Sequence, residues 1–133
     1  LAKLINQIDH KKLIILDYEA NARETIRKTL APFVDILRAH DKDVPILIIS
    51  KIRYAGELNS RSQLETARGR AKFQADFVRA RQAAGDKNIH FLDGGSLLGK
   101  DAHECTVDGI HPTDLGFMKM AKAIQPMIKT ILE

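Results

Sequence analysis

Two residues of this 133-residue chain, Asp108 and His111, have the types and the spacing of an acid–base pair. Histidine is the commonest general base near neutral pH, and it needs a partner that fixes its tautomer and stabilises its protonated ring. An aspartate three positions earlier can fold back onto a ring nitrogen, because Gly109 between them relaxes the turn. The same spacing also fits an N-terminal helix cap beside an incidental exposed histidine, so the pair needs support from the rest of the chain.

Three short runs of Ile, Leu and Val predict the strands that would position this pair, at residues 13–16, 45–50 and 89–92. Each run is continuous rather than alternating, which is typical of a strand buried on both faces of a sheet. The sequence therefore predicts strands that are covered by helices on either side.

The segments between and after these runs have helical periodicity. One apolar stripe recurs at helical spacing over residues 26–37, and a second helix is predicted from about Ser62 to Ala84. A third helix should follow the proline at position 112, with Thr113 or Asp114 as its N-cap. These three helices would alternate with the three strands.

Alternating strands and helices predict an α/β fold, in which a parallel sheet has helices on both faces. In such sheets the residues that do chemistry lie in the loops after the carboxyl ends of the strands, here residues 17–22, 51–60 and 93–112. Two prolines fall inside predicted helices: Pro32 should kink the first, and Pro126 should bend or restart the last.

The stretch from Val107 to Phe117 closely resembles the last conserved block of the SGNH (GDSL-type) hydrolases. In that family an Asp-x-x-His-Pro sequence precedes the C-terminal helix, and a glycine follows a few positions on. The resemblance implies that His111 is the catalytic base and that Asp108 is its orienting acid. It also implies a flavodoxin-like three-layer α/β/α fold, of which this chain carries the last three strands and their helices.

A second block of the family, Gly-x-Asn-Asp, corresponds to the loop after the first predicted strand, residues 13–16. There Asn21 matches the asparagine whose side-chain amide donates to the oxyanion, a role that suits a fixed donor at the carboxyl end of a strand. This sequence departs from the block at two positions, since Glu19 stands in place of the glycine and Ala22 in place of the aspartate.

The family's nucleophilic serine lies in an earlier Gly-Asp-Ser block, which this chain does not contain. The chain's four serines are Ser50, Ser60, Ser62 and Ser96. Ser96 has glycine neighbours, but it opens a long loop instead of a sharp strand-to-helix turn, so no nucleophile is assigned within the chain.

We therefore expect residues 1–133 to be a single domain that forms the C-terminal fragment of a longer SGNH hydrolase. The strand from Leu13 to Leu16 would then have an open edge, which invites pairing. A missing N-terminal segment or a second chain is expected to cover that edge. Members of the family with this appearance are often exported, and any export signal would precede Leu1, so localisation stays open.

The composition indicates neither a nucleic-acid partner nor a membrane span. The net charge is +4 with both signs interleaved, and no apolar stretch reaches the length that a bilayer requires. The single cysteine, Cys105, allows no intrachain disulfide. The group His103, Glu104, Asp108 and His111 matches no common zinc spacing, and the hydrolase mechanism requires no metal or organic cofactor.

Three functions fit these patterns. The leading one is hydrolysis of an acyl or acetyl ester, on a small molecule or a carbohydrate, by a Ser-His-Asp mechanism in which this chain alone is inactive. The second is a receiver-like signalling domain in which Asp17 accepts a phosphoryl group and Ser50 acts as the switch residue. The third is a non-catalytic binding domain that keeps the hydrolase fold.

Overall fold

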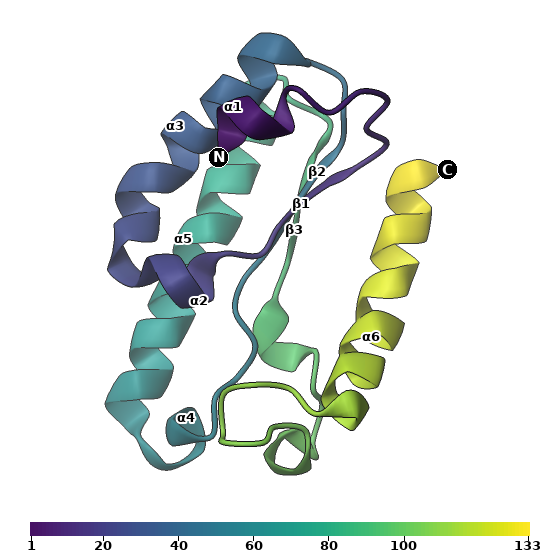
Figure 1. Ribbon diagram of the computed structural model, residues 1–133. Coiled ribbons are helices and arrows are strands. Elements are labelled where there is room, and N and C mark those ends of the chain that lie inside the picture. The colour runs from purple at the N-terminus through teal and green to yellow at the C-terminus, as the bar shows by residue number, and fades with distance from the viewer.

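The three apolar runs form one parallel sheet in the structure, a computed structural model that describes residues 1–133 (Figure 1). The strands lie in the order β1-β2-β3, with bounds β1 (Ile14–Leu16), β2 (Ile46–Ile49) and β3 (Ile89–Leu92). Since all three strands run the same way, the loops that follow them meet at one edge of the sheet.

Six α-helices accompany the sheet. They are α1 (Ala2–Ile5), α2 (Glu19–Ala22), α3 (Ile26–His40), α4 (Gly56–Asn59), α5 (Arg61–Ala83) and α6 (Asp114–Leu132). The long helices α3, α5 and α6 are the three that the sequence predicts, and α2 and α4 lie in the loops after β1 and β2.

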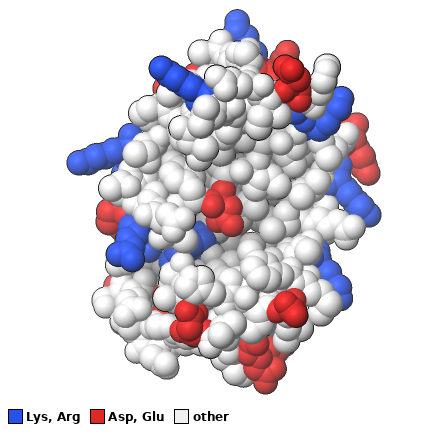
Figure 2. All heavy atoms as spheres, viewed as in Figure 1, with Lys and Arg blue, Asp and Glu red and all other residues white.

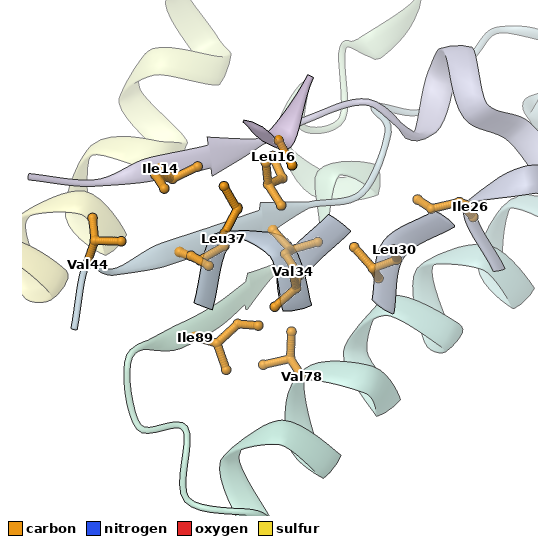
Figure 3. Packing of buried hydrophobic residues seen from close by; sticks show 12 residues of the cluster. Ile14, Leu16, Ile26, Leu30, Val34, Leu37, Val44, Val78 and Ile89 are labelled. Atoms are coloured by element: carbon orange, nitrogen blue, oxygen red, sulfur yellow. The ribbon is translucent and has the colours of Figure 1, made fainter. Parts of the chain in front are cut away.

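The main core lies between the sheet and the helices α3 and α5 (Figure 3). Helix α3 contributes four fully buried residues of the predicted apolar stripe, namely Ile26, Leu30, Val34 and Leu37. The sheet contributes Ile14, Leu16, Ile46, Ile48 and Ile89, and α5 contributes Val78. Burial of this much apolar surface fixes the sheet, and with it the loops at its carboxyl edge.

The opposite face of the sheet packs against α6, which gives the expected three-layer α/β/α arrangement (Figure 1). Leu47 and Ile49 of β2 are buried there among apolar side chains of α6. Ile15 of β1 points to the same face, beside Leu47, but it is 44% exposed. The prediction that each strand is buried on both faces is therefore confirmed for β2, whose four residues are all buried. It is wrong for β1, whose middle residue is exposed, and in β3 only Ile89 is fully buried.

The two prolines inside helices do not interrupt them. α3 continues through Pro32 and α6 continues through Pro126, so of the two alternatives predicted at Pro126, a bend or a restart, the restart is wrong. Each proline leaves a carbonyl four residues earlier without its amide donor. Those carbonyls belong to Lys28 and Lys122, which are exposed like the prolines themselves, so water can take the place of the missing donor.

Charges of both signs are interspersed on the face in Figure 2, where uncharged groups cover most of the surface. No patch of one sign extends across this face, in agreement with the mild net charge of +4. Among the helices, none combines the length and the apolar character that crossing a membrane would need.

Candidate active site

Asp108 and His111 are in direct contact, with Oδ2 of Asp108 2.7 Å from Nδ1 of His111. The other carboxylate oxygen, Oδ1, accepts hydrogen bonds from the backbone amides of His111 at 2.8 Å and Ile110 at 2.9 Å. One carboxylate therefore holds both the turn and the imidazole ring. The contact through Nδ1 leaves Nε2 of His111 without a protein partner, and the His111 side chain is 76% exposed.

These hydrogen bonds also keep Asp108 ionised. They hold the pKa of its carboxyl well below the usual value, with the largest contribution from the backbone amide of His111, followed by its ring and by the amide of Ile110. The carboxylate is thus negative throughout the pH range in which an imidazole gains a proton, so it can stabilise a protonated His111 ring.

The turn that carries the pair is attached to the loop after β2. Gly109 has φ of 84°, a left-handed conformation that glycine adopts without strain. Its carbonyl accepts a hydrogen bond from the amide of Ala55 at 2.8 Å. A Cβ at position 109 would lie only 2.9 Å from the Cβ of Ala55, so glycine is required by contact as well as by conformation.

The other end of the turn is attached to α6. Thr113 is the N-cap of this helix, because its hydroxyl accepts from the amide of Gly116 at 3.2 Å. The Thr113 amide donates to the carbonyl of Cys105 at 2.9 Å. Thr113, not Asp108, therefore caps the helix, and Asp108 is left to engage His111.

Asn21 lies on the short helix α2, directly after β1, and lines the same cavity as His111. This cavity has a volume of about 800 Å³ and is bordered mostly by polar residues, among them Tyr54 and Thr66. The side chain of Asn21 makes no hydrogen bond within the protein and is exposed. The fold therefore brings Asn21 and His111, which are 90 positions apart in the sequence, to one cavity.

Glu19, which the sequence marks only as a departure from the family block, forms the centre of a buried network. One of its carboxylate oxygens accepts from the backbone amide of Lys51 at 2.9 Å and from the side-chain amide of Gln74 at 2.8 Å. The other accepts from Nε of Arg70 at 2.9 Å. Through these contacts Glu19 joins α2 to the end of β2 and to α5, and so fixes the helix that carries Asn21.

None of the chain's serines is hydrogen-bonded to His111. Ser96 donates to the carbonyl of Asp93 at 3.0 Å and lines a different cavity. Ser62 does line the cavity of His111, but its hydroxyl pairs with that of Ser60 at 3.2 Å. The thiol of Cys105 is fully buried, so it presents no nucleophile to the cavity.

No group of three or more His, Cys, Asp or Glu side chains is placed so that it could hold a metal ion. Asp17 follows β1, as the receiver-like interpretation requires, and its pKa is raised by partial burial and by the nearby charge of Glu19. The phosphoryl acceptors of that interpretation need a metal-binding acidic cluster, and none surrounds Asp17 here.

A model of the GDSL-like lipase/acylhydrolase family matches residues 1–129. No curated protein matches the chain. This family assignment does not support the receiver-like interpretation, with Asp17 as phosphoryl acceptor.

Two solved structures resemble the chain over 98% of its length. One is described as a GDSL-like lipase from Bacteroides ovatus, with 32% identity and a TM-score of 0.87, and the chain covers 39% of it. The other is the salicylyl-acyltransferase SsfX3 from a tetracycline biosynthetic pathway, with 19% identity and a TM-score of 0.79, of which 40% is covered. The second likeness concerns the fold alone, and in both cases the chain spans about two fifths of the solved protein.

The contact between Gly116 and the Cys105 carbonyl gives a test of how the turn is held. A Cβ at position 116 would lie 2.2 Å from that oxygen, so Gly116→Ala must separate α6 from the turn. We expect a loss of about 1–3 kcal/mol in the free energy of unfolding, measured by urea denaturation of the complete gene product. Gly69→Ala in α5 is the control: its Cβ meets nothing closer than 3.7 Å, so stability should stay the same or rise slightly. Equal effects would contradict this account.

The hydrogen bonds to Asp108 predict its titration. As the pH falls through about 4, an ordinary aspartate gains a proton but Asp108 stays ionised. Since its folded pKa is the lower one, its contribution to folding is present above the unfolded pKa and is lost as the pH falls through the folded pKa. Carbon-13 NMR of the carboxyl group measures this. In His111→Ala the pKa of Asp108 should rise but stay below the usual value, because both amides still donate; an ordinary pKa in the unmutated protein would refute the assignment.

Proposed function

Because the chain belongs to the GDSL-like lipase/acylhydrolase family, we propose that Asp108 and His111 are the acid and the base of an ester-hydrolysing active site. The observation that carries this proposal is the 2.7 Å contact between Asp108 Oδ2 and His111 Nδ1, combined with an exposed Nε2 that has no partner. A general base must present a free nitrogen to the group that it deprotonates.

In this mechanism Nε2 of His111 takes the proton of a serine hydroxyl as the serine oxygen attacks the ester carbonyl. Asp108 stabilises the positive charge that the ring then carries. His111 returns the proton to the departing alcohol, and the acyl-serine is hydrolysed by a water molecule that the same nitrogen deprotonates. Transfer of the acyl group to another alcohol would use the same residues, with that alcohol in place of water.

Asn21 is proposed to donate a hydrogen bond from its side-chain amide to the oxyanion that develops on the carbonyl. Its place on the cavity of His111 supports this role, as does the absence of a competing intramolecular partner. The buried network around Glu19 holds α2 in position, which is what a preorganised donor requires.

The nucleophilic serine is proposed to lie outside residues 1–133. Two observations support this: no serine of the chain contacts His111, and the chain covers only 39% of the Bacteroides ovatus protein. On this proposal the same outside segment covers the open edge of β1, which is paired on one side only, and the nearby face on which Ile15 is 44% exposed. A second chain at that edge is the alternative occupant.

The substrate is proposed to be a small-molecule or carbohydrate ester with polar groups around the reacting carbonyl, such as an acetylated sugar. The support is the character of the cavity, in which polar and charged side chains outnumber apolar ones. A long acyl chain would find few apolar partners there.

The complete gene product, assayed on 4-nitrophenyl acetate, tests the proposal. His111→Ala should lower kcat by at least about 10³-fold, and Asp108→Asn by about 10²- to 10⁴-fold, because each removes part of one relay. Asn21→Ala should cost about 10²-fold in kcat with little change in KM. His103→Ala, which changes an exposed histidine beside Glu104, serves as the control that keeps full activity, and Ser62→Ala tests whether a serine of this chain is the nucleophile.

Unchanged hydrolysis in His111→Ala would refute the assignment of the base. Loss of activity in Ser62→Ala would place the nucleophile inside the chain instead of outside it. A folded but inactive gene product would favour the non-catalytic binding domain.

A further inference from the structure

Arg23 has a backbone conformation that is costly for a residue with a side chain. It follows α2 with φ of 50° and ψ of −130°, the region that glycine occupies in type II′ turns. Only one other non-glycine residue of the chain, His10, has a positive φ. Such strain persists only where the surrounding structure holds it, and it concentrates at functional sites.

The position of Arg23 connects this strain to the site. Arg23 comes two residues after Asn21 and lines the same cavity as Asn21 and His111. Burial and nearby carboxylates raise the pKa of Tyr54, another residue of the cavity, and the charge of Arg23 is close enough to oppose that rise.

Arg23 is also the one cation of the cavity without a counter-ion. Lys51 forms an ion pair with Glu57, and Arg70 pairs with Glu19 at 2.9 Å and with a second carboxylate at 3.0 Å. No carboxylate of the chain lies within ion-pair distance of Arg23. The cavity therefore holds one positive charge that the protein does not neutralise.

We propose that Arg23 binds a negatively charged group of the substrate, a carboxylate in the simplest case, so that the site selects esters that carry an anion away from the reacting carbonyl. This inference rests on the proposed function for its reaction and adds the substrate class. A guanidinium suits this role because its planar N–H groups form paired, charge-assisted hydrogen bonds with a carboxylate. The anion can belong to the acyl part or to the alcohol part of the ester.

Two pairs of esters distinguish these sources in the complete gene product. In the first pair, mono-4-nitrophenyl succinate carries the charge on its acyl part and is compared with neutral 4-nitrophenyl acetate. In the second pair, 4-acetoxybenzoate carries the charge on its alcohol part and is compared with neutral phenyl acetate. Arg23→Gln should lower kcat/KM for the anionic member of at least one pair by about 10- to 100-fold, mainly through KM. The neutral esters should change by less than about twofold.

Arg61→Gln is the matched control, because Arg61 is exposed, pairs with Glu65 and does not line the cavity. It should leave the preference between anionic and neutral esters unchanged. Arg23→Lys should keep part of the preference, since it retains the charge but not the planar group. Arg23→Gly should unfold a few degrees above Arg23→Gln, because glycine relieves the backbone strain without restoring the guanidinium.

A binding measurement separates this inference from the proposed reaction. Calorimetry of the unmutated gene product with benzoate and with neutral benzamide should show a preference for benzoate that Arg23→Gln abolishes, even if no ester is hydrolysed. Absence of that preference, or its survival in Arg23→Gln, would overturn the inference. So would equal losses on anionic and neutral esters, which would indicate a purely structural role for Arg23.

Discussion

The carboxylate of Asp108 uses one oxygen for the backbone and the other for the imidazole of His111. A rotation that improved one set of bonds would break the other, so the turn and the ring direction are fixed together. The turn itself is attached at Ala55 on one side and at the start of α6 on the other. The exposed Nε2 of His111 therefore has a defined direction although its side chain is mostly in solvent, as a base that must meet a reactant requires.

A second set of buried contacts places the other candidate residues. The sheet brings the ends of β1 and β2 together, and Glu19 then joins the backbone after β2 to side chains of α5. If one partner moved away, the buried carboxylate would lack a hydrogen bond, and this costs free energy. The complete network is therefore rigid. Asn21 and Arg23 follow Glu19 by two and four positions, so the proposed oxyanion and anion contacts both depend on this network.

Local pattern in the sequence was enough to predict the strands, the long helices and the α/β class, because a buried strand and an amphipathic helix each leave a direct periodic signal. The Asp108–His111 contact was predictable because it joins neighbours in one turn. The exposure of Ile15 was not, since it depends on where α6 lies across the sheet. The buried network of Glu19 and the strained backbone of Arg23 were also missed: the first depends on partners up to 55 positions away, and the second on a backbone angle that arginine rarely adopts.

The central claim is that this chain supplies the base of an active site whose serine lies elsewhere. Treatment of the complete gene product with a serine-directed fluorophosphonate, followed by digestion and mass spectrometry, tests it most directly. We predict one labelled serine outside residues 1–133, with a labelling rate that falls at least about 10³-fold in His111→Ala. Labelling of Ser62 or another serine of this chain, or a rate that does not depend on His111, would contradict it.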